Sequence, residues 1–560
     1  MNFNASSIHE KYPPLNPKPK RLDKYYTAYE IALPVLPSKR FLDWAELRVP
    51  VDFLTNGRAS VYLPKNLVLR VPHVELNGRL CLNSDPGPFQ YSPEDRIFFT
   101  LEVFEKQFLN KWINGDLDEH FTNEPLNYWE IFVLQSQQES CPVRRVLTID
   151  VAPPKSLIRE GLMIQPGGLV IVADGALPLR RRVIESLAPN TTQIKIRVAD
   201  IPLETPPTPA TWPTTSEELN VVLENYLGTK VLKKFNAPLR KRKEKPSHRF
   251  ALFRHDGQQY AYLLAGGPPM QLNIPEKGIF KKRRAFISSN RPIPLEVSRL
   301  DAEWTAGRDQ IPTVGKRQHQ HVLVLGAGAL GSPVINHLAK AGVGRITAVD
   351  PDTLNTANLA RHELGADQLF NYKVEALAQQ INKAYPSTCV EPIVKKAQFW
   401  VSNYGLDSVD MVLDLTGEPD VRWAIEQARI IKPCPILIGW MEPYVAAAHA
   451  CTLPDDVLWY RNDKDCLEEL QAVKWPNDVI KKEPGCSREF QSYTAAAADY
   501  AVAMIAENAL DILDGKISMA KVMSWVRGKD YLDRNYEGLN LRNWAKKASS
   551  GLGMIIQREF

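Results

Sequence analysis

HVLVLGAGALGS, residues 321–332, is the stretch of sequence that decides the fold of the C-terminal half. A mostly apolar run, residues 321–325, is followed by three glycines in the pattern GxGxxG: Gly326, Gly328 and Gly331. Glycines here permit a tight turn and close approach of a phosphate, and the free N–H groups of a helix beginning near Ser332 favour an anion. The stretch therefore predicts a strand, a nucleotide-binding loop and a helix.

The residues after this loop decide between nucleotides. Asp350 ends the next strand-like run, RITAVD, about twenty residues later, where a carboxylate can accept hydrogen bonds from ribose hydroxyls. NAD and ATP fit equally well up to this point. The chain then supplies polar and basic residues within one crossover: Asn358, Arg361 and Lys373. Cations neutralise a triphosphate and its departing pyrophosphate, and a dehydrogenase needs them less, so the pattern favours ATP.

The chain is too long for one hydrophobic core, since it has 560 residues. From about Leu300, strand-like and helix-like runs alternate, which predicts an α/β domain with a mostly parallel sheet. Before it lie short β-branched runs, a Pro-rich stretch at 202–213 and a hairpin signal around Asp256-Gly257. We therefore expect three parts: 1–145, 146–299 and 300–560. The middle part is either a linker with an inactive companion of the C-terminal domain or an independent adaptor.

Three motifs in the last part are GAGALGS (326–332), VDPDTLNTANLARH (349–362) and YKVEAL (372–377). In this order they resemble the ubiquitin-activating enzymes and their bacterial ThiF/MoeB-like relatives, over roughly residues 300–514. The resemblance implies a Rossmann-like adenylating domain that uses ATP and Mg²⁺. It implies roles for these residues: Asp350 at the ribose, Asn358, Arg361 and Lys373 at the phosphates, and Asp414 at the magnesium. Gly417 replaces a second family aspartate, so either Asp414 or Glu418 takes that part.

The seven cysteines are odd in number and form no CxxC pair, which indicates reduced thiols and no structural zinc site. Cys486 follows Pro-Gly in KKEPGCSREFQSY, where nearby basic residues would lower the thiol pKa. The resemblance places a transfer cysteine in this segment, with Cys466 as the alternative. Cys389 and Cys434 are expected to be inert small hydrophobes.

A second thiol, Cys81, lies in RVPHVELNGRLCLNSDPGPF, ahead of an amphipathic stretch at residues 94–112. This region resembles the active site of ubiquitin-conjugating enzymes, through His73, Gly78, Leu80, Cys81 and Leu82, and implies an α+β domain. The family's His-Pro-Asn is His73-Val74-Glu75 here, so the oxyanion donor would be Asn77 or Asn83. Asp85 is either a base or a turn residue, and Cys81 itself is either catalytic or structural.

The whole arrangement is similar to the fused activating and conjugating proteins of bacterial CBASS antiphage operons. It implies that a protein's C-terminal carboxylate, such as that of a nearby-encoded cGAS/DncV-like nucleotidyltransferase (CD-NTase), is adenylated and captured by Cys486. Transfer to Cys81 and then to a target amine follows. We also expect a homodimer.

Three other functions stay open: a sulfur-carrier adenylyltransferase without conjugation, an NAD-dependent oxidoreductase, and a scaffold without activity. The net charge of +5 is mild, and its densest run, RKRKEK at 240–245, is expected to be a linker, so nucleic acid is not a predicted partner. No apolar run approaches the roughly 20 residues of a membrane span. Residues 1–21 lack a signal-like apolar stretch, so we expect a cytoplasmic protein.

Overall fold

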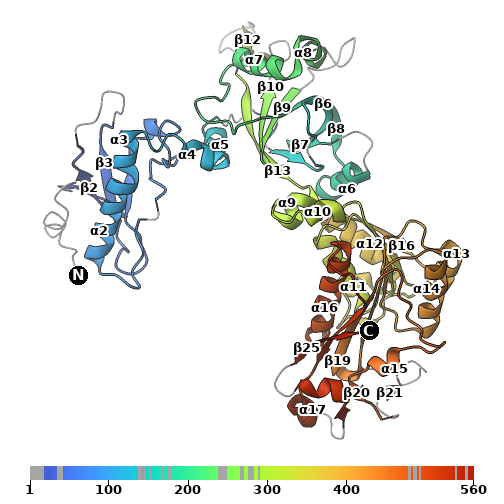
Figure 1. The fold of residues 1–560 in the computed structure, drawn as a ribbon. Helices are drawn as coiled ribbons and strands as arrows, with labels where there is room; N and C mark the ends of the chain where they lie inside the picture. Colours follow the sequence, from blue (N-terminus) through green and yellow to red (C-terminus); the bar gives the residue numbers. More distant parts are fainter. Residues whose placement is uncertain are drawn as a thin grey trace. The chain divides into compact units, whose positions relative to one another are not determined.

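The computed structural model describes residues 18–560 apart from 35–41, 83, 137–140, 142, 144, 152, 166–167, 174–177, 237–248, 265–269, 275–282, 288–290, 477–480, 483–488, 491–492, 536–538 and 549–552. The chain divides into two compact units (Figure 1). Unit one comprises Met1–Thr148, Ala152–Gly175 and Thr192–Ser298. Unit two comprises Ile149–Val151, Ala176–Thr191 and Arg299–Phe560. Each unit is described below by itself.

Unit one begins with a four-stranded antiparallel sheet whose strands follow chain order: β1 (Lys18–Leu22), β2 (Tyr26–Ile31), β3 (Ala45–Pro50) and β4 (Ser60–Tyr62). The Cys81 segment comes next, and then a long helical stretch: α2 (Pro93–Val103), a π-helical turn η2 (Phe104–Leu109) and α3 (Asn110–Asn114). Phe104 and Phe108 of this stretch are fully buried in one core with Leu47 of β3. The amphipathic stretch at residues 94–112 is helical, and the expected α+β domain is confirmed.

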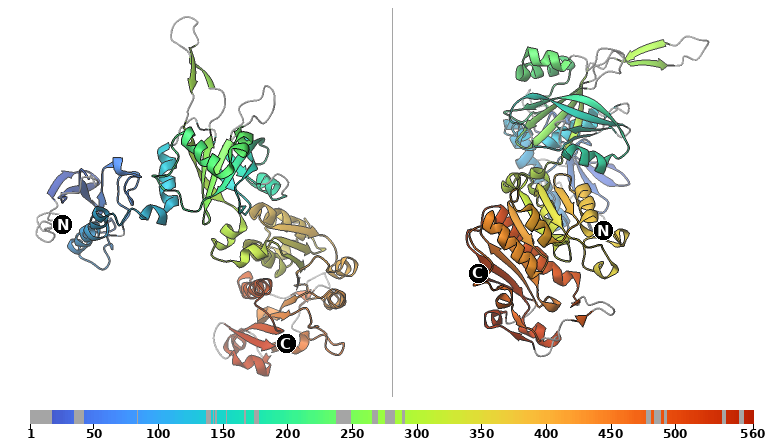
Figure 2. Two further views of the ribbon diagram at one scale, coloured as in Figure 1. Left: turned by 45° about the horizontal axis from the view of Figure 1, so that its top comes forward. Right: turned by 90° about the vertical axis from the view of Figure 1, so that its right-hand side faces the viewer.

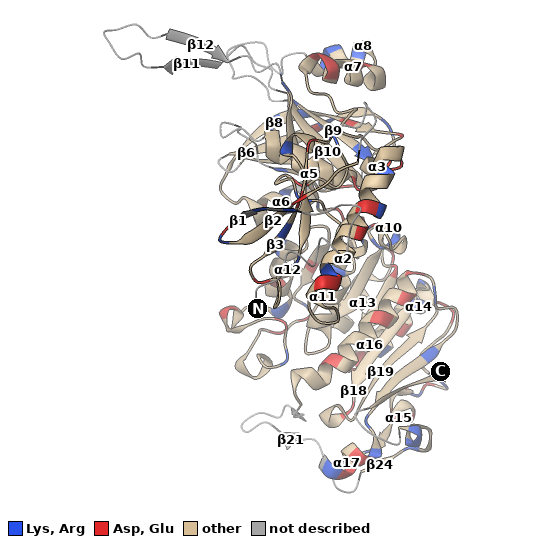
Figure 3. Ribbon diagram, turned by 90° about the vertical axis from the view of Figure 1, so that its left-hand side faces the viewer, with Lys and Arg blue, Asp and Glu red and all other residues tan. Residues whose placement is uncertain are grey.

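The ends of this helical stretch follow from its sequence. Ser92 caps α2 by accepting a hydrogen bond from the N–H of Asp95, and Pro93 occupies the first helical position. Glu94 and Asp95 place negative charge in the first turn, where the helix dipole favours it. Figure 3 draws the acidic residues of α2 in red. The stretch ends at Gly115, whose φ of +88° is a conformation that other residues rarely adopt.

The remainder of unit one is a closed barrel in the strand order β10-β13-β5-β7-β6-β8-β9. Its strands are β5 (Arg145–Thr148), β6 (Leu157–Gln165), β7 (Leu169–Val172), β8 (Thr192–Pro202), β9 (Arg249–His255), β10 (Gln258–Leu264) and β13 (Ile293–Arg299). The predicted Asp256-Gly257 turn joins β9 to β10, with φ of +44° and +76°. A separate two-stranded hairpin pairs β11 (Met270–Ile274) with β12 (Arg283–Ile287) (Figure 2).

A helix that follows the Cys81 segment packs on this barrel. It is α5 (Pro125–Ser136), preceded by the short α4 (His120–Asn123). The Trp129 ring of α5 makes edge-to-face contacts with three aromatic rings: Trp212, Tyr260 and Tyr262. Its indole Nε1 also donates to the Leu295 carbonyl at 3.0 Å. These contacts fix α5, so the residues that α5 presents toward Cys81 are held by the barrel core.

Unit two contains an eight-stranded sheet in the order β16-β15-β14-β17-β18-β19-β23-β25. The first five strands run parallel: β14 (His321–Leu325), β15 (Arg345–Val349), β16 (Cys389–Ile393), β17 (Met411–Asp414) and β18 (Ile436–Met441). Three antiparallel strands extend it: β19 (Ala447–Leu453), β23 (Lys521–Val526) and β25 (Met554–Glu559). The predicted α/β class with a mostly parallel sheet is confirmed.

The parallel part reverses its winding at one place. From β14 the chain goes to β15 and β16 on one side, and then crosses to β17 and β18 on the other. In open α/β sheets, ligands bind beside the carboxyl ends of the strands at such a switch point. The loops after β14 and β17 therefore form the expected place for a ligand.

Helices cover both faces of this sheet (Figure 1). On one face lie α11 (Gly331–Lys340), α12 (Lys373–Ala384) and α16 (Ala495–Leu513), and on the other α13 (Ala397–Tyr404) and α14 (Pro419–Ile431). The Ala-rich α16 is a core helix, because Ala501, Ile505 and Ala509 are fully buried. None of the helices among the described residues is long and apolar enough to cross a membrane.

One helix from the middle of the chain belongs to unit two. It is α6 (Pro178–Leu187), which lies in the sequence between two barrel strands but packs against α12. The Arg182 guanidinium donates two hydrogen bonds, of 3.1 and 3.0 Å, to the Pro386 carbonyl just after α12. These residues fall within the range expected to be a separate middle part, so the units interleave along the chain more than sequence segmentation suggests.

Candidate active site

The glycine loop joins β14 to α11 with the backbone that the motif predicts. Gly326 has a φ of +89°, and its N–H donates to the Val349 carbonyl at 2.9 Å. A Cβ on Gly331 would lie 1.8 Å from the Gly326 carbonyl oxygen, so only glycine fits there. A Cβ on Gly328 would meet nothing within 4 Å, which leaves open space beside this residue. Two glycines thus shape the loop, and the third leaves room for a ligand.

Asp350, which follows β15, holds this loop with both carboxylate oxygens. Its Oδ2 accepts the Ala327 N–H at 2.8 Å, and its Oδ1 accepts the Asp352 N–H at 2.8 Å. The residue is only 7% exposed. Each carboxylate oxygen has a second lone pair, so these bonds leave acceptor capacity for a hydroxyl of a ligand.

His362 is a second support of the loop, and sequence reasoning assigned it no role although it lies in a quoted motif. Its Nδ1 accepts the Leu364 N–H at 3.1 Å, so the proton is on Nε2, which donates to the Ala327 carbonyl at 2.8 Å. Burial lowers its pKa and keeps the ring neutral. Ala327 is therefore held from both sides, through its N–H by Asp350 and through its carbonyl by His362.

The predicted phosphate ligands lie on the segment that leads from β15 to α12. Lys373 is the first residue of α12, is 6% exposed, and places its Nζ 3.0 Å from Asp352 Oδ2. The Arg361 guanidinium lies 5.7 Å from the centre of the Tyr493 ring. The Asn358 Oδ1 accepts the Asn355 N–H at 3.1 Å and closes a 3-10 turn, η3 (Thr356–Asn358). Asn358 thus has a local structural role as well.

Asp414 is the last residue of β17 and pairs in register with Leu325, directly before the glycine loop. It is 1% exposed. Its Oδ1 accepts two hydrogen bonds from Thr416, from the N–H at 3.1 Å and the hydroxyl at 2.6 Å, while its buried Oδ2 has no hydrogen-bond partner among the described residues. Burial raises its pKa. An unpartnered carboxylate oxygen beside the glycine loop fits a divalent cation such as Mg²⁺, which prefers oxygen ligands. Glu418, the alternative, is exposed.

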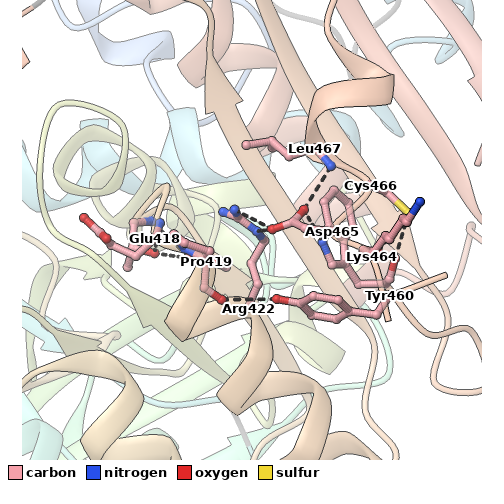
Figure 4. Close-up of polar contacts among 11 residues, drawn as sticks. Glu418, Pro419, Arg422, Tyr460, Lys464, Asp465, Cys466 and Leu467 are labelled. Carbon is pink, nitrogen blue, oxygen red and sulfur yellow. Dashed lines mark hydrogen bonds and ion pairs between the residues drawn. The ribbon is translucent and has the colours of Figure 1, made fainter. Parts of the chain in front are cut away.

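A polar network fixes the chain beside Asp414 (Figure 4). The Arg422 guanidinium of α14 donates two hydrogen bonds to Asp465 Oδ2, at 2.9 and 2.7 Å. The Trp459 indole donates to Asp465 Oδ1. The Tyr460 hydroxyl donates to the Pro419 carbonyl at 3.2 Å. Burial has the largest effect on the pKa of Asp414 and raises it. The charge of Arg422 lowers this pKa and that of Asp465 raises it, both by less. The network ties residues 459–467 to the start of α14.

The cysteines of unit two differ in their surroundings. Cys486 lies outside the described residues. Cys466, its alternative, is 4% exposed, and its thiol donates to the Trp459 carbonyl at 3.0 Å (Figure 4). Burial raises the pKa of Cys466, and it raises that of Cys434 to about 12. Cys389 is half-buried. The geometry of Cys466 therefore fits a structural role.

Cys81 is exposed, which fits the catalytic interpretation better than the structural one. Its N–H donates to the His73 carbonyl at 2.8 Å, and Val74 pairs with Leu80 in an antiparallel bridge. Gly78 closes this small hairpin with a φ of +90°. Burial raises the Cys81 pKa, as do the nearby carboxylates of Glu75 and Glu124, while Arg79 lowers it.

Two polar residues that the sequence suggested for the Cys81 site have other roles in the structure. Asn77 Oδ1 accepts the Arg79 N–H at 2.9 Å within the hairpin turn, and Asn83 lies outside the described residues. Asp85 is 5% exposed and is committed elsewhere: it accepts hydrogen bonds from Ala59 N–H at 2.7 Å, Gly87 N–H at 2.8 Å and Arg96 Nε at 2.8 Å. Asp85 therefore supports the turn and is not placed to act as a base.

Two side chains that the sequence did not suggest lie beside His73. The His73 Nε2 is 2.8 Å from the Nδ1 of His120, and the His73 N–H donates to the Tyr128 hydroxyl at 3.0 Å. His120 and Tyr128 follow His73 by 47 and 55 residues. No local spacing rule could find such partners, because they come from α4 and α5 rather than from the Cys81 hairpin.

Comparison with known proteins agrees with the fold and motifs of unit two. Residues 310–545 match the ThiF family. The chain is 28% identical over 257 residues to "ATP-dependent ubiquitin transferase-like protein Cap2" of Pseudomonas aeruginosa, which covers 43% of this chain and 45% of that protein. It is 36% identical over 162 residues to "Adenylyltransferase and sulfurtransferase UBA4" of Yarrowia lipolytica, covering 29% and 39%.

Among solved structures, E. coli MccB with ATP aligns over 38% of this chain and 61% of that chain, at 17% identity and a TM-score of 0.30, which is too low to support an inference. The chain spans less than half the length of the two curated relatives. It carries a ThiF-family domain and resembles a bacterial fused protein of the Cap2 kind, as its motifs predicted.

Proposed function

We propose that this chain activates the C-terminal carboxylate of a protein by adenylation with Mg-ATP and passes it on as a thioester. The observation that carries the proposal lies at the switch point of the ThiF-family domain. There the open glycine loop adjoins Asp414, whose buried Oδ2 has no hydrogen-bond partner in the part of the chain that the structure describes. A loop shaped for phosphate beside an unpartnered carboxylate suits a metal-bound triphosphate better than a dinucleotide.

The roles of the binding residues follow from their positions. The N–H groups of the glycine loop and of the first turn of α11 would receive phosphate oxygens, and Asp350 would accept a ribose hydroxyl through its remaining lone pairs. Asp414 would hold Mg²⁺, which supplies neutralisation of phosphate charge. Lys373 is paired with Asp352 and would exchange that partner for a phosphate. Arg361 and Asn358 lie on the same segment.

In the first reaction, an oxygen of the substrate carboxylate attacks the α-phosphorus of ATP, and the bond to pyrophosphate breaks. Negative charge grows on the leaving pyrophosphate. Arg361 and Lys373 carry fixed positive charge and would stabilise it, which lowers the barrier more than it tightens ATP binding. The product is an acyl adenylate.

In the later reactions, the Cys486 thiolate attacks the acyl carbon, and AMP leaves. The Cys81 sulfur then replaces Cys486 at that carbon, and an amine of a target protein replaces Cys81 to form an isopeptide bond. The resemblance to Cap2 supports a CD-NTase encoded nearby as the activated protein, in antiphage defence. A cytoplasmic homodimer is the assembly that we propose.

A non-reducing gel of the full chain tests the relay. Mg-ATP and the protein encoded beside the chain are added, and the wild type is compared with Cys81→Ala, Cys486→Ala and the control Cys141→Ala, a half-buried thiol. We expect a thiol-sensitive adduct in the wild type and the control, none in Cys486→Ala, and an adduct stalled on Cys486 in Cys81→Ala. Pyrophosphate release without any cysteine-dependent adduct would contradict the relay.

A second function, adenylation of a sulfur carrier without conjugation, is favoured by the 36% identity to UBA4. It needs the ATP site but not Cys81, so an activity that survives Cys81→Ala would identify it. The oxidoreductase alternative predicts binding of a nicotinamide cofactor and no pyrophosphate exchange, and the ThiF match favours adenylation over it. The scaffold alternative predicts that Mg-ATP does not bind.

A further inference from the structure

The hairpin that carries Cys81 places His73 directly opposite it. The bridge between Val74 and Leu80 and the hydrogen bond from Cys81 N–H to His73 O make the two residues cross-strand neighbours. His73 has a φ of +65°, which costs a non-glycine residue about 1 kcal/mol. Tyr128 holds this conformation by accepting the His73 N–H. Backbone strain that is held in place by a partner is typical of functional sites.

The two histidines form a pair that shares one proton. Their rings meet edge to face, 5.0 Å between centres, with His73 Nε2 2.8 Å from His120 Nδ1. Whichever nitrogen donates, the neutral pair keeps one further lone pair, on His73 Nδ1 or on His120 Nε2. Among the described residues neither of these nitrogens has a hydrogen-bond partner. Protonation there leaves the shared hydrogen bond intact and makes it charge-assisted.

We propose that His73 and His120 act as one proton-accepting pair for acyl transfer from Cys81 to an amine. The inference rests on the proposed function, in which Cys81 carries the thioester. The amine nitrogen bonds to the acyl carbon, the carbon–sulfur bond breaks with its electron pair on Cys81 sulfur, and the proton lost by the nitrogen passes to the pair. No other reactant is needed. The pair supplies a base that Asp85, bonded to Arg96, does not.

The electrostatic surroundings suit this role. Burial lowers the pKa of His73, and His120 and Lys111 lower it further, while Glu124 opposes them. The lowered pKa keeps His73 neutral at pH 7, so the pair has a lone pair that can accept a proton. The pKa of the Cys81 thiol is raised, chiefly by burial and by Glu75, so Cys81 is a poorer leaving group and acyl transfer gains from a base that takes the proton of the amine. Tyr128 has a raised pKa and stays protonated.

The test uses the full chain and a small thioester, so that it does not depend on adenylation. N-acetylglycine thiobenzyl ester charges Cys81 without ATP, the Cys81 peptide is quantified by mass spectrometry, and hydroxylamine then discharges it. The variants are His73→Asn, which tolerates a positive φ, His120→Gln, and both together. His255→Gln is the control, because its half-buried ring is on the barrel side of unit one, where its Nδ1 lies 3.1 Å from the Leu203 carbonyl oxygen.

We expect each single variant to slow discharge about 10²-fold, and the double variant to be no slower than either, because the residues act as a unit. The ratio of wild-type to variant rates should shrink toward one as the pH falls below about 6.5, since the wild-type pair then becomes protonated. A purely structural role predicts a ratio of rates that does not depend on pH, and such a ratio overturns the proposal. Unchanged discharge rates in the variants overturn it too. So does a wild-type Cys81 that the small thioester does not charge.

Failure of the proposed function is distinguishable from these outcomes. If Mg-ATP and the protein substrate never charge Cys81 while the small thioester still reveals the pH-dependent histidine effect, the relay is wrong and the proton-accepting pair stands. If Mg-ATP charges Cys81 and the histidine variants discharge normally, the relay stands and the pair is overturned.

Discussion

The two candidate sites of this chain are built in different ways. The nucleotide site is assembled within one strand–loop–helix crossover and the segment after it, and its framework is backbone: Gly326, Ala327 and Gly331 set the loop. The Cys81 site is assembled from side chains of a hairpin, of α4 and of α5, which itself is held by the barrel. A backbone site is visible in a local sequence pattern, whereas a side-chain site depends on tertiary packing.

A buried cluster in unit two is also built from side chains of distant segments, but it has no functional role. Glu442 is 2% exposed and accepts hydrogen bonds from Ala472 N–H, Val473 N–H, the Trp475 indole and His449 Nε2. His449 is fully buried and also contacts the Ser524 hydroxyl at 2.8 Å. Since no substrate reaches a Ser-His-Glu group that is closed off in this way, we assign it to stability.

The largest expected effect is therefore on folding. Glu442→Ala leaves at least three buried donors without an acceptor and should lower the free energy of unfolding by about 3–5 kcal/mol. The exposed Glu469→Ala is the control and should have little effect. Thermal unfolding of the full chain measures both. Equal melting temperatures would show that the cluster is not structural.

Asp414→Asn tests whether the unpartnered carboxylate is kept for a cation. Adenylation measured by pyrophosphate exchange should fall about 10²- to 10³-fold, the usual cost of losing one charge-stabilising group. The folding stability of the variant should rise although its activity falls. Because burial raises the folded-state pKa of Asp414, ionisation at neutral pH destabilises the fold, and stability is gained as the pH falls.

The asparagine variant should thus melt at a higher temperature than the wild type without Mg-ATP, and Mg-ATP should stabilise only the wild type. Acidification should narrow the difference between the two metal-free proteins. If the variant is instead less stable at pH 7 and still responds fully to Mg-ATP, Asp414 is a structural residue and Glu418 becomes the candidate ligand.

Gly331→Ala and Gly328→Ala separate the two uses of glycine in the loop. The Cβ at position 331 collides with the Gly326 carbonyl, so this variant should lose about 1–3 kcal/mol of stability together with ATP binding. The Cβ at position 328 enters open space, so this variant should keep its melting temperature but bind ATP more weakly. Similar melting temperatures for both variants would contradict the distinction.

Sequence reasoning found the parts of the molecule that depend on local rules. The glycine pattern, the amphipathic stretch at residues 94–112 and the Asp256-Gly257 turn each follow from spacing or turn chemistry within a few residues. It did not find His362, His120 or the actual partners of Asp85, because these contacts are decided by packing between distant segments. The barrel was beyond prediction because it makes neighbours of strands that lie far apart in the sequence, such as β5 and β13.

The smallest expected effect on stability concerns the Cys81 site. Tyr128→Phe removes the hydrogen bond that the His73 N–H donates and nothing else of similar size, so unfolding should become easier by only about 0.5–1.5 kcal/mol. The consequence for chemistry should be distinct. Without this bond His73 is free to leave its positive φ, so the discharge of charged Cys81 should slow while its pH dependence is kept, since both histidines remain. A loss of the pH dependence would mean that Tyr128 itself takes part in the proton transfer.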